Sequence, residues 1–420
     1  MNKRDIFHPV FFTSVFGFIT NVPFLWIIYF DKFELDKKIL NSKEIYNLSN
    51  SIGHVSILLA LGFIGFAIGN TMSKKNFKSS TFSIHPKGLK FILVSVITIF
   101  LTLFSYITFL NKIGGFSVLI YNLEQRAEFT NGNGLLLLFI NLLMFVFLLL
   151  FYRQNYKLNL LYLIILLISF LLYLGINLTL GGRKPVIFAV LMILIVRHFS
   201  YRKVNVFRLK YITIILVLLM FITIVPIMRQ ADFVEKMVAD PSIFVISLKE
   251  TSFDQLKDLS YINTYIYIYQ HFSHNEKWYG KVFLNLPVSF IPSSIFLDKP
   301  PVDEGVYIRT LIEGYPAKPN DAFKNLYPSS WPPETFGNGY MNFGFLGVFF
   351  FHLALGAIKG SLYNLMKLKG SFPYIFIYGY VLLNFQISNL RIVQTLSILA
   401  MFLLWYRLVV VKKRKSEKYV

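Results

Sequence analysis

Long apolar runs separated by short polar segments make up most of the chain. A helix needs about 20 apolar residues to cross the hydrocarbon core of a bilayer, and ten runs approach or reach that length. The run that begins near His8 has no small-residue cleavage site before Asp31, so we expect it to be retained as the first span. The runs predict membrane-spanning helices at 8–30, 55–73, 91–110, 135–152, 159–179, 185–199, 211–228, 339–358, 373–390 and 393–411.

Composition supports the same fold class. Of the 420 residues 55% are hydrophobic and only 15% are charged, whereas soluble domains carry about 25% charged residues. Such a chain cannot coat a globule with charge, which excludes a disordered chain and an ordinary cytosolic enzyme. The absence of Cys excludes thiol nucleophiles, thiolate metal sites and a disulfide scaffold. We therefore predict an all-α polytopic integral membrane protein with about ten transmembrane helices.

The distribution of basic residues predicts the orientation. If the N-terminus is cytoplasmic, the inner segments hold 23 Lys and Arg and the short outer segments hold 9. Cytoplasmic loops carry the excess of Lys and Arg in membrane proteins, so we expect both termini inside. The net charge of +21 then follows from topology, and we expect no nucleic-acid partner.

One segment differs from the rest of the chain. Residues 229–338 hold 13 of the 21 acids and 10 of the 16 prolines, and by parity they form a large extracytoplasmic loop. Long loops inside compact proteins are usually functional. We expect amphipathic helices at 241–259 and 261–272 and an ordered loop after Pro287. The loop separates the first seven spans (1–228) from the last three spans and a basic cytoplasmic tail (339–420).

Arg183 is the first candidate for ligand binding. It follows Gly181 and Gly182 between the fifth and sixth spans, and Pro185 comes two residues later. Glycines allow a tight turn, and a helix N-terminus offers N–H donors and partial positive charge to an anion such as phosphate. The competing interpretation is a tight hairpin with an interfacial arginine.

Four further arginines also lie on the outer side near helix ends, where each alone fits a surface or salt-bridged role. Together with Arg183 they predict a site for a diphosphate, because the arginine fork matches phosphate oxygens. They are Arg126, Arg229, Arg309 and Arg391.

Spacing does not select a general base among the outer acids and histidines, and we name Glu334, Glu304 and His271 as the candidate catalytic residues. His271 and His274 share a helix face, but two histidines without a third ligand are weak evidence for zinc. Glu34 and Asp36 form an acid-x-acid pair amid lysines, which favours a solvated charged loop. We expect no metal site and no cofactor.

Three segments resemble a known family, the Wzy-type oligosaccharide repeat-unit polymerases of O-antigen and capsular polysaccharide. LGGRKPVIFAVL resembles the family's arginine turn that opens a mid-chain helix. LPVSFIPSSIFLDKP resembles the Lys-Pro segment of the large outer loop, and ETFGNGYMNFGFLGVFFFHLALG resembles the helix that follows. The order of the segments and the position of the large loop agree with the family as well.

The resemblance implies a metal-independent glycosyltransferase with a GT-C-like architecture in the bacterial cytoplasmic membrane, with its site on the outer face. The donor and acceptor would be undecaprenyl-diphosphate-linked oligosaccharides, and a chain-length regulator protein would be a partner. Arginines such as Arg183, Arg229 and Arg309 would hold the diphosphate, and an acid or histidine would deprotonate the acceptor. Aromatic residues of the loop would stack on sugars, or anchor the loop at the membrane interface. They include Trp278, Tyr279, Tyr307, Tyr315 and Trp331.

Two other functions remain open from the sequence. An O-antigen ligase-type transferase would use the same donor with a different acceptor, and an essential histidine in the large loop, such as His271 or His274, would favour it. A lipid-glycan flippase or transporter would have two similar halves with broken helices at the midplane. The halves of this chain are dissimilar.

The topology predicts which side of the membrane each loop occupies. Because the chain has no Cys, a single cysteine placed at Asn320 reports on the large loop alone. We expect an impermeant thiol reagent to label it in intact cells. Labelling only after lysis would contradict the orientation.

Overall fold

The computed structural model describes the larger part of the chain. The described residues are 5–30, 39, 47–73, 85–86, 88–122, 129, 133–153, 159–205, 208–227, 233–240, 242–243, 247, 260–291, 295–296 and 298–411.

The protein is a multi-pass helical membrane protein. Its only strands within the described ranges are two-residue segments, β1 (His85–Pro86) and β2 (Val410–Val411), which pair antiparallel. Seven of the described helices are long and apolar enough to cross a membrane: α1 (Pro9–Phe30), α3 (Leu48–Met72), α4 (Gly88–Ile113), α7 with α8 (Gly134–Ile140, Leu142–Arg153), α9 (Leu160–Thr179), α17 (Glu334–Lys369) and α19 (Asn389–Val409).

The other three predicted spans also coincide with helices. These are α10 (Arg183–Ser200), α11 (Leu209–Ile227) and the shorter α18 (Phe372–Asn384). The number of ten spans therefore remains a prediction. Seven of the ten are supported by the length and composition of the helices. The smaller elements are α5 (Phe116–Tyr121), α12 (Phe233–Ala239), α14 (Ile262–His274), η3 (Lys281–Leu284), α15 (Asn285–Val288), α16 (Glu304–Ile312) and η4 (Phe323–Asn325).

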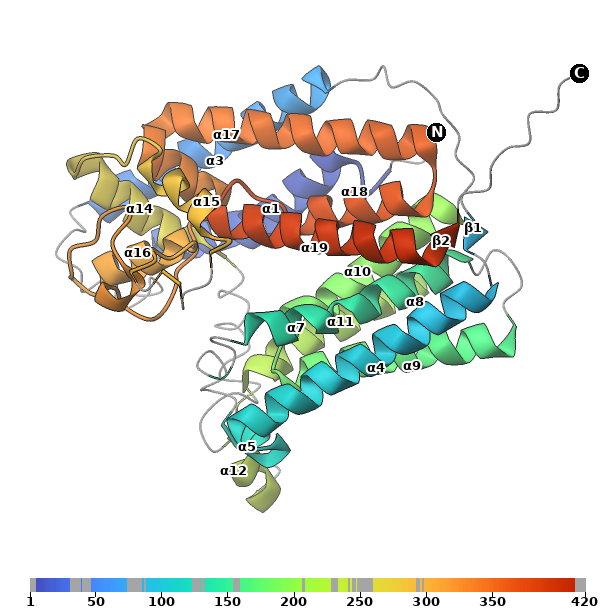
Figure 1. The fold of residues 1–420 in the computed structure, drawn as a ribbon. Helices are drawn as coiled ribbons and strands as arrows, with labels where there is room; N and C mark the ends of the chain where they lie inside the picture. Colours follow the sequence, from blue (N-terminus) through green and yellow to red (C-terminus); the bar gives the residue numbers. More distant parts are fainter. Residues whose placement is uncertain are drawn as a thin grey trace, which may run out of the picture. The chain divides into compact units, whose positions relative to one another are not determined.

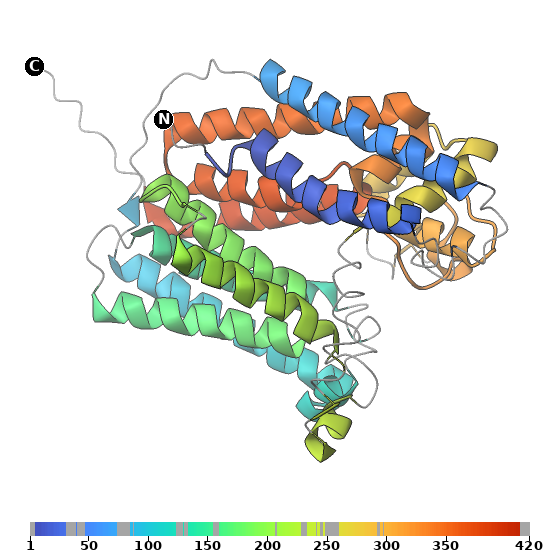
Figure 2. The ribbon, with the colours of Figure 1, turned by 180° about the vertical axis from the view of Figure 1, so that it is seen from behind.

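The chain packs as two compact units (Figures 1 and 2). The first contains α1, α3 and the described part of the large loop from residue 260 onward, together with α17 to Leu368 and residues 380–397. The second contains α4 to α12 with residues 369–379 and 398–420, so that α18 and α19 contribute to both. This division by packing leaves the predicted topological boundaries at 228 and 338 untested.

The large loop is more helical than expected. The predicted helix at 261–272 is confirmed as α14, whereas most of 241–259 lies outside the described residues. The region after Pro287, expected as ordered loop, also contains α16. This helix begins at a capping residue, because the side chain of Asp303 accepts a hydrogen bond from the N–H of Gly305 at 2.9 Å.

The eighth predicted span is in fact two helical arms. α17 begins at Glu334, five residues before the predicted start, and its backbone leaves the helical region at Phe343 and Gly344, where Gly344 has φ +64°. A Cβ on Gly347 would lie against the carbonyl oxygen of Gly339. Eight residues of a continuous helix span about 12 Å, so this contact shows that the first arm (334–342) folds back along the second arm (345–369).

The second arm packs tightly against α3 in the first unit (Figure 2). A Cβ on Gly69 of α3 would meet the Leu353 carbonyl oxygen, and a Cβ on Gly356 would meet the Phe66 carbonyl oxygen. Small residues that let two backbones approach are the usual basis of helix association in membranes. These glycines therefore fix the distance between α3 and α17.

Two glycines of α3 allow a matched test of this contact. Gly69→Ala inserts a methyl group into the Leu353 backbone, and we expect a loss of about 1–3 kcal/mol in stability. Gly53→Ala meets no atom within 4 Å and should be neutral or slightly stabilising, because alanine favours helix. Thermal unfolding of both variants in detergent measures the difference. Equal midpoints would contradict the close packing.

Candidate functional site

The structure places the predicted site residues unequally. Glu304, Glu334, Arg309, Arg391 and His271 all belong to the first unit. Arg183 belongs to the second unit. Four residues that the sequence singled out lie outside the described residues: Arg126, Arg229, Glu34 and Asp36.

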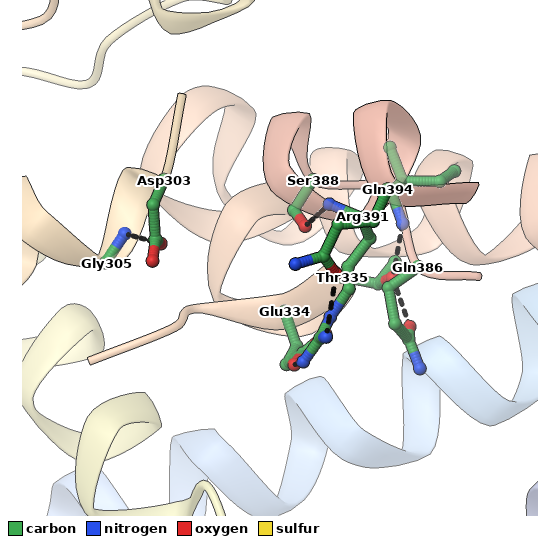
Figure 3. A network of polar contacts seen from close by, with 9 residues as sticks. Asp303, Gly305, Glu334, Thr335, Gln386, Ser388, Arg391 and Gln394 are labelled. Carbon is green, nitrogen blue, oxygen red and sulfur yellow. Dashed lines mark hydrogen bonds and ion pairs between the residues drawn. The ribbon is translucent and has the colours of Figure 1, made fainter. Parts of the chain in front are cut away.

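A buried ion pair joins one candidate catalytic residue to one candidate phosphate ligand. Arg391 donates from Nη2 to Glu334 Oε1 at 2.6 Å and from Nε to Glu334 Oε2 at 3.4 Å (Figure 3). The side chains are only 14% and 6% exposed. The sequence named both residues but gave no reason to pair them, since they are far apart in the chain.

The folded-back first arm positions the acid. Glu334 is the first residue of α17, directly after Pro332 and Pro333, and it has the left-handed φ of +46°. For a residue with a side chain this conformation costs about 1 kcal/mol or more and persists only where the surroundings enforce it. Here the surroundings are the ion pair itself and the hydrogen bonds of the neighbouring Thr335 to residues 386 and 387.

The turn between α18 and α19 positions the arginine. The hydroxyl of Thr335 donates to Gln386 Oε1 at 2.5 Å and accepts from the N–H of Ile387 at 2.9 Å. Asn338, one helical turn further, donates to the carbonyl oxygen of Ile387 at 2.9 Å. The turn that precedes Arg391 is thus attached to the same arm that carries Glu334.

Two groups of the large loop complete the centre. The hydroxyl of Tyr261, just before α14, lies within hydrogen-bonding reach of both Glu334 and Arg391. Burial, and then the charge of Glu334, raise the pKa of Tyr261, so that it stays a neutral hydroxyl. Burial also raises the pKa of Asp303, although the bond from Gly305 and the nearby charge of Arg391 oppose the shift.

Glu304 lies behind the ion pair rather than in it. Its Oε1 accepts hydrogen bonds from the N–H of Asn389 at 2.5 Å and from Asn338 Nδ2 at 3.2 Å. Complete burial raises the pKa of Glu304 to about 8, against the opposing effect of the Asn389 bond. The neutral acid therefore joins α16, the first arm of α17 and the start of α19, which suits a structural role better than a general base.

A further cation lies within α17. Lys359 comes directly after the predicted span at 339–358, and it lies inside the helix with only 2% of its surface exposed. Its Nζ donates to the carbonyl oxygen of Leu382 at 3.1 Å, in the last turn of α18. A cation at a helix C-terminus interacts favourably with the helix dipole, so Lys359 holds the end of α18 from which the turn toward Arg391 begins.

Arg309 and His271 lie in other surroundings. Arg309 pairs with Glu313, and its guanidinium lies 5.2 Å and 5.1 Å from the ring centroids of Tyr327 and Trp331. His271 lies ten residues beyond Tyr261 along α14, which is roughly 15 Å at the helical rise. Arg309 is therefore already engaged by other partners, and His271 is remote from the Glu334–Arg391 pair.

Arg183 begins α10, as the sequence predicted for a glycine turn. The N–H groups of Gly181 and Gly182 donate to Leu178 and Asn177, both at 2.8 Å, and Gly181 has φ +62°. This pattern is the Schellman motif that ends a helix, and it closes α9. The side chain of Arg183 is half-buried in the second unit.

The aromatic residues of the loop differ in how far their side chains are exposed. Tyr307 and Trp278 are buried in the core, whereas Tyr279 and Tyr315 expose 59% and 62% of their surface. Only exposed rings can stack on a sugar. Next to the ion pair, side chains of α3, α14 and α17 line a small apolar cleft, whose lining includes Tyr265, Phe336 and Gly337.

The structure and the comparisons give no further chemical identity to the site. In the described part of the chain no three His, Asp or Glu side chains are grouped so as to hold a metal ion. Comparison of the chain with protein-family models, curated protein sequences and solved structures found no match. What is shown is a multi-pass helical membrane protein with a buried charged centre.

The ionisation of Glu304 predicts a pH dependence of stability. Between the ordinary pKa of about 4.5 and the raised pKa of about 8, the folded state binds more protons than the unfolded state, so stability falls as pH rises. Glu304→Gln keeps the acceptor oxygen and removes the titration. We expect its midpoint of thermal unfolding to change less between pH 5 and 9 than that of the parent, and to exceed it at the alkaline end. Parallel curves would contradict a raised pKa.

Proposed function

We propose that the chain polymerises undecaprenyl-diphosphate-linked oligosaccharide repeat units, on the outer face of a bacterial cytoplasmic membrane. The observation that carries the proposal is the buried Glu334–Arg391 pair. It joins a carboxylate of the segment that resembles the repeat-unit polymerases, at the start of α17, to a guanidinium at the start of α19. The two groups are those that glycosyl transfer from a lipid diphosphate requires.

The chemistry assigns one role to each partner. In the transfer, the bond from the sugar C1 to the diphosphate oxygen breaks and a bond from C1 to the acceptor hydroxyl oxygen forms. Arg391 stabilises the charge that grows on the diphosphate, and Glu334 takes the proton of the acceptor hydroxyl. The diphosphate would replace Glu334 as the partner of Arg391, which frees the carboxylate to act as base when the donor is bound.

The surroundings of the pair suit such substrates. Tyr261 offers a neutral hydroxyl beside both charged groups, and the small cleft lined by α3, α14 and α17 gives the pair an apolar surrounding. Tyr279 and Tyr315 remain available for sugar stacking. Arg183 as a further diphosphate ligand, the GT-C-like architecture and a chain-length regulator as partner belong to the same proposal.

A lipid-glycan transporter is the second candidate, because Lys359 is a buried cation within a membrane-spanning helix. Such residues often mark transport pathways. Ligase-type transfer would use the same ion pair with another acceptor. The purified protein distinguishes these functions, since only a polymerase lengthens the lipid-linked repeat unit by itself.

The decisive experiment incubates the purified protein with an undecaprenyl-diphosphate-linked repeat unit in EDTA and follows product length by gel. We expect polymer from the parent protein. Glu334→Gln should lower the rate by about 10²–10⁴-fold, the usual contribution of a general base. Arg391→Ala and Arg183→Ala should abolish polymer, and Arg391→Lys should restore only part, because an ammonium cannot copy the bidentate fork.

Controls separate chemistry from folding. Removing one partner of a buried pair leaves an uncompensated charge and costs about 3–5 kcal/mol, so Glu334→Gln combined with Arg391→Gln tests the site without that charge. Lys324→Ala disrupts the exposed pair with Asp298 and should leave polymerisation unchanged. Full activity of the double variant would refute the assignment. Loss in EDTA with recovery on added Mn²⁺ would refute metal independence.

A further inference from the structure

A part of the large loop presents apolar side chains outward although it lies outside the membrane-spanning helices. The side chains begin at the last residue of η3, continue beyond α15 and belong to the first unit. We call them the 284–296 apolar face. It consists of Leu284, Phe290, Ile291, Ile295 and Phe296, whose exposed fractions run from 37% to 75%. Five such side chains in a short segment would be costly in water.

One lysine ties the segment into a single surface. Lys299 donates from Nζ to the carbonyl oxygens of Ser289 at 2.8 Å and Ile291 at 2.7 Å. Its own N–H donates to the carbonyl oxygen of Phe296 at 3.2 Å. The turns that carry Phe290 and Phe296 are therefore held together by the same residue.

The face continues the lipid-facing surface of α17. The ring of Phe283, next to Leu284, packs at 5.8 Å from that of Phe351 in the second arm. Phe351 lies seven residues beyond Gly344, which is about 10 Å along the helix. Leu346 and Phe350, from the same stretch of the arm, are 68% and 57% exposed, as expected for residues that face lipid.

Backbone groups in the described part of the segment are hydrogen-bonded within the protein. Irregular backbone at membrane depth is tolerated only where its polar groups are satisfied by protein. The N–H groups of Ser289 and Ile291 donate to Leu286 and Val288 at 3.1 Å each, and Lys299 satisfies the carbonyl groups. The carbonyl oxygen of Val282 accepts from Asn389 Nδ2 at 2.7 Å.

We propose that the 284–296 apolar face inserts into the bilayer, among the acyl chains of the leaflet on its side of the membrane. The segment is then an interfacial wedge beside α17 and the start of α19, and the stem of Lys299 reaches over it. The inference rests on packing and exposure and is independent of the proposed function.

Spin labels test the insertion in the complete protein. Because the chain has no Cys, Phe290→Cys and Ile295→Cys each carry one nitroxide, in vesicles of phosphatidylglycerol and phosphatidylethanolamine. Phe350→Cys serves as the lipid reference and Lys318→Cys, on an exposed loop, as the water reference. Power saturation with oxygen and with a water-soluble nickel chelate gives the relative accessibility of each site.

The outcomes are distinct. We expect the ratio of oxygen to nickel accessibility at 290 and 295 to match that at 350 and to exceed that at 318 several-fold. A ratio equal to that at 318 would place the face in water and overturn the proposal. Protection from both reagents would mean that a protein surface covers the face, which overturns it equally. Because the labels occupy exposed positions, loss of folding does not confound the result.

Discussion

The reversal of α17 at Phe343 and Gly344 is the feature on which the rest of the first unit depends. A helix that ends near lipid leaves carbonyl groups without partners, and each such group costs several kcal/mol in hydrocarbon. The loop before η3 satisfies them: the N–H of Trp278 donates to Met341 at 3.0 Å and that of Tyr279 to Asn342 at 3.2 Å. The large loop therefore makes the reversal possible, and the reversal brings Glu334 back toward α19.

The same constraint explains why the charged centre is surrounded by amides and hydroxyls. A buried ion pair contributes little net stability, because desolvation offsets most of its Coulomb energy. Thr335, Asn338 and Lys359 instead satisfy the turn between α18 and α19, and this turn holds Arg391 against Glu334. Apart from the bond of Lys359, the hydrogen bonds that position the pair are neutral, so the charges of the pair remain available for a ligand that can exchange with one of them.

The sequence predicted the helices well and the site only in part. Apolar runs long enough to span define each helix locally, and the glycine turn before Arg183 depends on adjacent residues alone. The fold-back of α17 could not be predicted from apolarity, because the predicted span at 339–358 crosses the reversal without a charged residue. Its signal was the polar residues Thr335, Asn338 and Asn342, which recur at helical spacing up to the reversal. The pairing of Glu334 with Arg391 required that fold-back, so composition and spacing could name the residues but not join them.

A short series of hydrogen bonds connects the segment that carries the 284–296 apolar face to the Glu334–Arg391 pair. Val282, two residues before Leu284, accepts the hydrogen bond from Asn389, and Asn389 lies two residues before Arg391 in α19. The backbone N–H of the same Asn389 donates to Glu304. The start of α19 is thus held on one side by a neutral acid and on the other by the segment that meets the bilayer. A displacement of Val282 would therefore act first on Asn389, which lies two residues before the arginine of the ion pair.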